Sequence, residues 1–178
     1  LLVLDGLCTY HPADSVAKLG VEAVQEFFQQ GLDEVPAPWH LRNPVFSQPA
    51  LARALHHANQ HIFQDSETLP SHAGQGATVA GIHLTSDATH LVCAHAGDVQ
   101  VYLLRDGTLT RCTRSHSLAH TYVDMGILSK EDVPLFPYNN VVTRGLGLSD
   151  VMEIDHQEIK IWPQDVFLVC SDGLTDEL

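Results

Sequence analysis

Three aspartates, each beside a glycine, follow apolar runs that lie far apart in the chain. They are Asp5 after residues 1–4, Asp98 after residues 91–97, and Asp172 after residues 166–171. Aspartate is unfavourable inside a strand, but at the end of a buried strand its carboxylate can project into a cleft. Carboxylate oxygens, and the carbonyl oxygen of a residue such as Gly6, suit Mg²⁺ or Mn²⁺. The pattern predicts a divalent-metal site, with the alternative that each Asp-Gly pair only forms a turn.

A second pattern with metal-binding potential is the pair His57 and His61. A spacing of four residues places two imidazoles on one face of a helix, where both could ligate one ion. The sequence contains 12 histidines and shows no third ligand for this pair. We therefore interpret the pair as part of a solvated helix face.

Composition limits the classes of partner. The 178 residues suit one domain, and a formal net charge of -13 with no basic run predicts neither a nucleic-acid partner nor an acidic membrane surface. No apolar run approaches the ~20 residues that a membrane-spanning helix needs. The four cysteines contain no C-x-x-C pair, so a disulfide framework is not expected. We expect a cytoplasmic protein.

The elements that must position the carboxylates fall into two halves. Apolar residues recur every three or four positions over residues 13–30 and 51–62, which predicts two amphipathic helices, the first with Asp14 or Ser15 as N-cap. Residues 31–49 form a long variable loop. A helical stretch is expected at 117–125, and a short helix begins at 129–132. Strands are predicted at 1–4, 78–85, 90–96, 99–105, 108–113, 158–162 and 165–170, with a hairpin turn at 106–107. This order predicts an α+β fold with helices covering sheet faces.

Several motifs occur in the order found in one known family. They are residues 2–6 with His11, then 74–78, 94–98, 101–107, 113–118, 123–129, 140–147 and 170–176. On these motifs the chain resembles the bacterial branch of the metal-dependent protein phosphatases, the 2C type or PPM family, over essentially its whole length. The resemblance implies a four-layer αββα sandwich of two antiparallel sheets flanked by helices. It implies one partial domain over residues 1–178, truncated at both ends, with a flap at about 116–147.

The resemblance also implies a site and an activity. Two Mn²⁺ or Mg²⁺ ions would be held by Asp5, the Gly6 carbonyl and Asp172, and Asp98 would share a third, weaker ion with Asp172. Asp5 and Asp172 would thereby be catalytic, and a metal-activated water would hydrolyse phosphoserine and phosphothreonine. The implied partners are phosphorylated proteins in the pathway of a cognate Ser/Thr kinase.

An alternative of a different class is a degenerate phosphatase-like module that binds a partner without turnover. The family follows its first Asp-Gly with a glycine pair, whereas residues 7–10 here contain no glycine, and Asp98 is followed by Val99-Gln100. A glycine-free loop has fewer backbone conformations available beside the metals.

Three further side chains have two interpretations each. His11 is either a general acid for the leaving group or a helix-entry residue. Arg144 either clamps a phosphate oxyanion or forms a salt bridge between flap and core, and we favour the salt bridge. His116 either contacts substrate from the flap or, as we prefer, caps and packs the flap.

Overall fold

Two helices form the first layer of the molecule. The computed structural model describes residues 1–7, 13–31 and 48–175. Helix α1 (Ala13–Gln29) and helix α2 (Ala50–Thr68) confirm the predicted pair, and both bury apolar residues at three- and four-residue spacing. Gly31, at φ +67°, follows the end of α1 as expected. The predicted N-cap is wrong, because α1 already includes Asp14 and Ser15.

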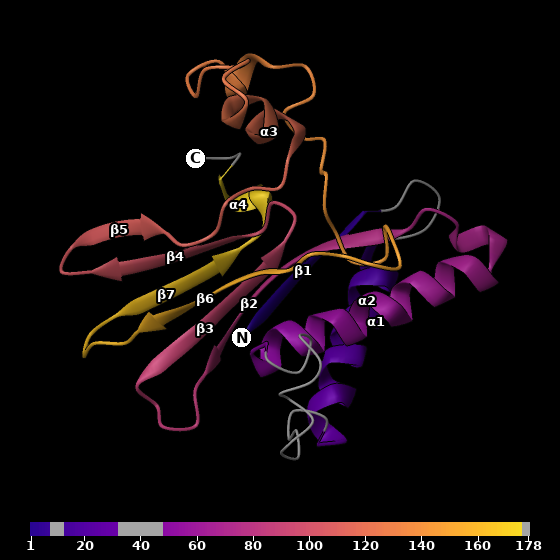
Figure 1. The fold of residues 1–178 in the computed structure, drawn as a ribbon, viewed down its shortest axis with the longest axis horizontal. Coiled ribbons are helices and arrows are strands. Elements are labelled where there is room, and N and C mark those ends of the chain that lie inside the picture. Colours follow the sequence, from indigo (N-terminus) through magenta and orange to yellow (C-terminus); the bar gives the residue numbers. More distant parts are fainter. Residues whose placement is uncertain (8–12, 32–47, 176–178) are drawn as a thin grey trace.

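A four-stranded antiparallel sheet lies against these helices (Figure 1). Its order is β1 (Leu2–Leu7), β2 (Gly76–Leu84), β3 (His90–Ala96) and β6 (Asp155–Lys160). Successive side chains alternate between its faces. Leu4, Val79 and Ala94 pack with the helices, whereas Val3, Ala80 and Cys93 belong to a second core on the opposite face.

Strand β1 is longer than predicted. We expected it to stop at Asp5-Gly6, but the strand continues to Leu7 because β2 begins early enough to pair with it. In the register, Asp5 lies opposite Thr78 and Gly6 opposite Ala77. Asp5 shares the alternation of Val3 and so lies on the face that looks towards the second sheet.

The second sheet is three-stranded and antiparallel, in the order β5 (Thr108–Arg111), β4 (Gln100–Arg105) and β7 (Val166–Cys170). The hairpin between β4 and β5 is confirmed, since Asp106 and Gly107 have φ of 49° and 74°. Val101 and Val169 pack from this sheet into the second core, together with Val99 just before β4. The short helix α4 (Asp172–Thr175) begins directly beyond β7.

One end of the two sheets is fastened by Arg105. Its Nε and Nη2 donate to the two carboxylate oxygens of Asp165 at 2.8 and 2.7 Å, and Nη2 also donates to the Lys160 carbonyl at 2.8 Å. The guanidinium lies 4.4 Å from the centre of the Trp162 ring. We call this set the Arg105 clamp. It joins β4 and β7 of the small sheet to the end of β6 in the large one.

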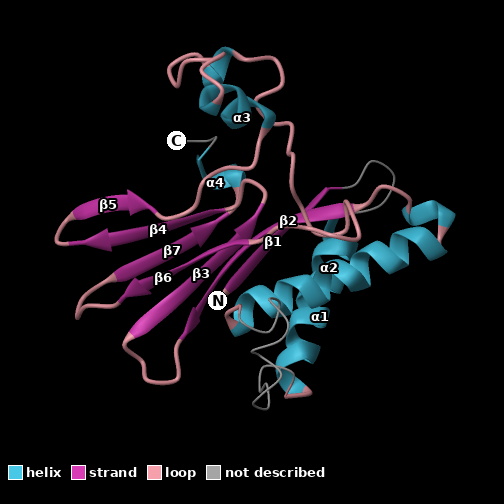
Figure 2. Ribbon diagram, in the orientation of Figure 1, coloured by secondary structure: helices cyan, strands magenta, loops and turns pink. Residues whose placement is uncertain are grey.

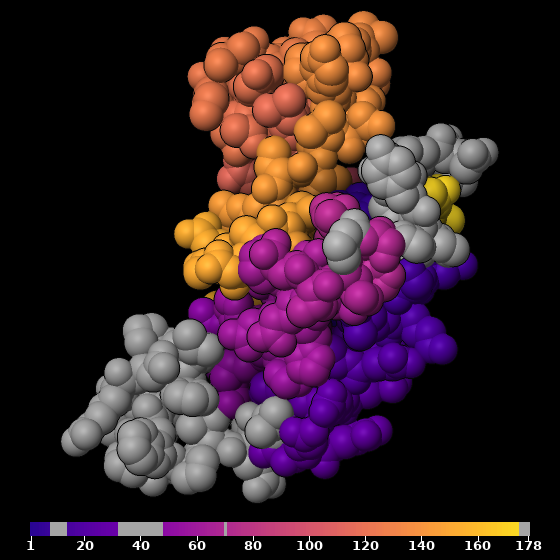
Figure 3. Space-filling view, turned by 90° about the vertical axis from the view of Figure 1, so that its right-hand side faces the viewer, coloured from indigo at the N-terminus to yellow at the C-terminus, as the bar shows by residue number. Residues whose placement is uncertain are grey.

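The segment 116–147, which the resemblance predicts to be a flap, contains α3 (Leu118–Asp124) and a 3₁₀ turn, η4 (Val133–Leu135), and it forms a lobe beside the sheets (Figure 3). We keep the name flap for this segment. Ser117 caps α3 by accepting a hydrogen bond from the His120 N–H. The predicted short helix at 129–132 is wrong. The Ser129 hydroxyl instead closes a turn by donating to Asp132, and helical geometry begins only at Val133.

These elements confirm the α+β prediction with two antiparallel sheets (Figure 2). Strand β6 begins at Asp155, earlier than predicted, and β5 ends at Arg111, earlier than predicted. A one-turn 3₁₀ helix, η3 (Pro70–His72), precedes β2. Most of the predicted variable loop, 32–47, lies outside the described residues. None of the described helices has the length and apolar character required to cross a bilayer.

Candidate active site

The three predicted carboxylates converge on one edge of the molecule from different elements. Asp5 comes from β1 of the large sheet, Asp172 follows β7 of the small sheet, and Asp98 lies in the connection between β3 and β4. Asp98 and Asp172 line one cavity, and the charge of Asp172 raises the pKa of both Asp5 and Asp98. The edge is therefore built jointly by the two sheets.

Burial adds to this repulsion. It is the largest cause of the raised pKa of Asp5 and of Asp98, with the Asp172 charge second in both cases. For Asp98 its own backbone N–H and the nearby Thr78 side chain act in the opposite direction. Half-buried carboxylates that repel one another gain from a cation between them, and hard oxygen donors fit Mn²⁺ or Mg²⁺. The donor set thus fits the predicted metals, although the three carboxylates are not among the described clusters whose donor atoms all lie within 4.8 Å.

Gly97 sets the position of Asp98. Its φ is +107°, and a Cβ at this residue would lie 2.4 Å from the Thr78 side chain. Only glycine can adopt this φ and also lie this close to the Thr78 side chain. The connection between the two sheets can therefore pass close to β2 and present Asp98 beside Thr78.

The structure describes only some of the other residues that we predicted for this edge. Gly6 lies inside β1. His11 lies outside the described residues, as do residues 8–10 of the altered loop.

Two histidines and an aspartate form a separate cluster at the root of the flap. The His95 and His116 rings stack with centroids 4.7 Å apart and an interplanar angle of 13°. His116 Nδ1 accepts the Gly97 N–H at 3.1 Å, so its Nε2 carries the proton, which it donates to Asp155 at 3.2 Å. His95 Nε2 donates to the Arg114 carbonyl at 2.7 Å. We call His95, His116, Asp155 and Arg144 the flap root.

Arg144 completes the flap root. Its Nη1 pairs with Asp155 at 3.1 Å and its Nη2 pairs with Glu153 at 3.2 Å. This is the salt-bridge arrangement that we favoured over a phosphate clamp. Burial opposes ionisation of Asp155, but the hydrogen bond from His116 and the nearby positive charge outweigh it and lower the pKa.

The donor atoms of His95, His116 and Asp155 lie close enough to suggest a metal site. The hydrogen bonds favour another interpretation, because Nδ1 of His116 accepts a backbone N–H and Nε2 must then hold a proton. A protonated nitrogen has no lone pair for a metal. Burial lowers the pKa of His116 and lowers that of His95 to about 4, so both rings are neutral near pH 7. We interpret the cluster as the attachment of the flap.

Sequence reasoning missed the pairing of His95 with Asp155. The two residues lie opposite one another in β3 and β6. We expected β6 to begin at residue 158, which left Asp155 outside the sheet. The only signal that could have revealed this pair is a correct prediction of the residue at which β6 begins.

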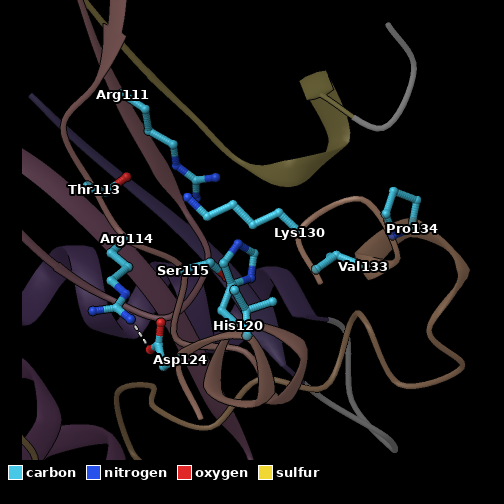
Figure 4. A pocket seen from close by; sticks show the side chains of 10 residues that line it. Arg111, Thr113, Arg114, Ser115, His120, Asp124, Lys130, Val133 and Pro134 are labelled. Carbon is cyan, nitrogen blue, oxygen red and sulfur yellow. Dashed lines mark ion pairs between the residues drawn. The ribbon is translucent and has the colours of Figure 1, made fainter. Parts of the chain in front are cut away.

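A basic hollow of about 520 Å³ opens between β5, α3 and the loop before η4 (Figure 4). Arg111, Arg114 and Lys130 contribute positive charge to it, and their charges help burial to lower the pKa of His120. Arg114 is paired with Asp124. Among the described residues, no carboxylate lies within ion-pair distance of Arg111 or Lys130. The lining residues are Arg111, Thr113, Arg114, Ser115, His120, Val123, Asp124, Lys130, Val133 and Pro134.

The basic hollow is continuous with the carboxylate edge. A neighbouring cavity of about 260 Å³ shares Arg111 and His120 with it and reaches Asp98 and Asp172. The lack of a basic run in the sequence did not reveal this hollow. Its cations come from separate segments, so no basic run marks them in the sequence.

Comparisons with known proteins find a family model and several relatives that match this chain. A family model described as Stage II sporulation protein E (SpoIIE) matches residues 11–178. The serine/threonine phosphatase stp of Listeria welshimeri is 27% identical over 176 residues, which are 99% of this chain and 66% of that protein. The chain therefore spans slightly less than two thirds of this relative.

Solved structures are similar over the same extent. The serine/threonine phosphatase PstP/Ppp of Mycobacterium tuberculosis superimposes with a TM-score of 0.80 at 26% identity, covering 99% of this chain and 69% of that one. The catalytic domain of a serine/threonine protein phosphatase PstP in complex with two manganese ions gives a TM-score of 0.73, also at 26% identity, covering 99% and 68%.

Proposed function

We propose that this chain forms the larger part of a catalytic domain that hydrolyses phosphoserine and phosphothreonine in proteins. The premise is that the chain belongs to the SpoIIE family of 2C-type bacterial serine/threonine phosphatases. The observation that carries the proposal is the convergence of Asp5, Asp98 and Asp172, from both sheets, beside a basic hollow.

Divalent metal would be held by Asp5, the Gly6 carbonyl and Asp172, with Asp98 and Asp172 sharing a further ion. Such ions lower the pKa of water and neutralise charge on phosphoryl oxygens. The solved structure of a PstP catalytic domain in complex with two manganese ions supports the proposal that this chain binds divalent metal. The backbone at Gly97 keeps Asp98 at the edge, where partial burial raises the pKa of its carboxyl group.

The described thiols support hydrolysis without a cysteine nucleophile. Burial raises the pKa of Cys93 to about 12, and it also raises those of Cys112 and Cys170. A thiol that stays protonated at pH 7 is a poor nucleophile. Phosphate transfer to any of these side chains is therefore disfavoured.

The basic hollow gives the substrate a place to bind beyond its reacting phosphate. The Arg111 and Lys130 side chains extend into it (Figure 4), and positive charge in a concave surface attracts anionic groups. We assign it to an acidic or phosphorylated side chain of the same polypeptide substrate. The net charge of -13 over the whole chain would repel such a substrate, which makes this local attraction important.

The test uses the full-length protein. Hydrolysis of p-nitrophenyl phosphate and of a phosphothreonine peptide should require added Mn²⁺ or Mg²⁺ and should stop on chelation. Asp172→Asn should remove the metal-dependent rate, while Asp106→Asn in the β4–β5 turn should leave it unchanged. Activity that survives Asp172→Asn would contradict the proposal.

The binding-module alternative is favoured by the glycine-free residues 7–10 and by Val99-Gln100 after Asp98. It predicts a full-length protein that binds phosphopeptides but has no turnover with any divalent metal. The same assays therefore separate the two functions.

A further inference from the structure

Helix α2 turns two histidines towards α1. His57 and His61 lie one helical turn apart, with ring centroids separated by 4.4 Å. Glu26, near the end of α1, faces them, and one donor atom from each of the three side chains lies within 4.8 Å of the other two. The crossing of the helices thus supplies the third ligand that the sequence did not show.

The His57 ring is not satisfied by hydrogen bonds from the described part of the chain. Its Nε2 is buried and has no hydrogen-bond partner among those residues. A buried nitrogen left without a partner is destabilising, and such groups are uncommon in folded proteins. A ligand that engages this imidazole would remove that penalty.

The availability and support of the side chains suit metal binding. His57 Nε2 is not engaged by the described part of the protein and remains available to an ion. Glu26 is held in place, because Gln30 Nε2 donates to its Oε1 at 2.6 Å. A hydrogen bond from a neighbour is the usual way in which a carboxylate ligand is oriented.

We propose that Glu26, His57 and His61 form a zinc site that links α1 to α2. Two imidazoles and one carboxylate are a donor set that Zn²⁺ accepts, with a fourth position left for water. Mg²⁺ prefers oxygen donors only, which distinguishes this site from the carboxylate edge. The helices pack on the opposite face of the large sheet from Asp5. The site is therefore separate from the proposed catalytic centre.

The test measures zinc uptake rather than phosphatase activity. The full-length protein carrying Asp172→Asn, in excess Mg²⁺, is titrated with zinc chloride by calorimetry and with cobalt chloride by visible absorption. We expect one zinc equivalent and the intense cobalt bands of four-coordinate nitrogen and oxygen ligation. His57→Gln and His61→Gln should each weaken zinc binding at least ~100-fold. His56→Gln, the adjacent histidine on the same helix, is the control and should bind zinc as the parent does.

A second variant protects the test from misfolding. Glu26 is at least partly exposed, so Glu26→Gln should fold normally and still weaken zinc binding by ~10-fold or more. Zinc should also raise the melting temperature of the parent by roughly 5 °C, but not that of His61→Gln. Equal zinc uptake by the parent, His61→Gln and Glu26→Gln would overturn the proposal, whether or not the protein is a phosphatase.

Discussion

The flap root and the carboxylate edge place aspartates on the same face of the large sheet, yet the two groups of aspartates behave in opposite ways. Asp155 has a lowered pKa because His116 and Arg144 outweigh the effect of burial. Asp5 and Asp98 have raised pKa values because burial and Asp172 act together. The charged side chains around a carboxylate, rather than its position in a strand, decide whether it holds the flap in place or can bind a cation.

The opposite pKa shifts reflect two roles: the flap root stabilises the fold, whereas the carboxylate edge is suited to bind a cation. At the flap root, the two histidines and the arginine all have hydrogen-bonded or ionic partners within the chain. At the carboxylate edge, like charges are kept together although the fold gains nothing from their repulsion. A protein retains such an arrangement where chemistry requires it.

The largest expected contrast is in catalysis. In the full-length protein, Asp5→Asn should lower kcat by ~1000-fold or more, because it removes a charge from the proposed metal site. Asp155→Asn should lower kcat less than about fivefold, since Asp155 only attaches the flap. Steady-state kinetics with saturating Mn²⁺ measures both, and circular dichroism checks folding. Equal losses in the two variants would remove the distinction between the regions.

The next contrast is in pH dependence. The folded pKa of His95 is about 4, below its ordinary value of 6.5, so the unfolded chain takes up a proton between these values and the folded chain does not. The contribution of His95 to stability is complete above pH 6.5 and is lost as the pH falls towards 4, by up to about 3 kcal/mol.

Urea unfolding at pH 7.0 and 4.5, with metals chelated, measures this effect. His95→Asn lacks the titrating ring and should lose less stability between the two pH values than the parent does. The raised pKa values of Asp5 and Asp98 act in the reverse direction in both proteins and cancel in the difference. Identical pH dependence in parent and variant would mean that His95 titrates normally.

A smaller contrast concerns stability without metal. Asp155→Asn should lower the free energy of unfolding by about 1 kcal/mol, because it weakens the bonds to His116 and Arg144 at a half-exposed position. Asp98→Asn should raise it by roughly 0.5 kcal/mol, because repulsion from Asp172 is relieved. Denaturant titration in chelator measures both, and a loss in Asp98→Asn comparable to that in Asp155→Asn would contradict the comparison.

The smallest effect should come from the basic hollow. Arg111→Ala with Lys130→Ala should raise KM for an acidic phosphopeptide by roughly threefold and leave kcat unchanged, since exposed charges contribute weakly. The matched control, Lys18→Ala with Lys160→Ala, removes the same charge from other surfaces. The KM difference should shrink in high salt, and equal KM values for the two double variants would argue against substrate contact there.

The sequence predicted the elements whose signals are local. The three- and four-residue periodicity located α1 and α2, and Asp106-Gly107 located the hairpin. The same dipeptide type misled at Asp5-Gly6, because pairing with β2 overrides a local turn preference. Long-range partners were beyond reach, since Glu26 meets His57 only through the helix crossing and Asp155 meets His95 only through the strand register.

The Arg105 clamp has a mechanical consequence for the carboxylates. It fastens the sheets where β4 ends and β7 begins, whereas Asp98 precedes β4 and Asp172 follows β7. The connection through Gly97, which packs against Thr78, joins the same two sheets at the carboxylate end. Fastened at both ends, the sheets have little freedom to change the angle between them. The spacing between Asp5 and Asp172 is therefore set by the packing of the sheets and not by a flexible loop.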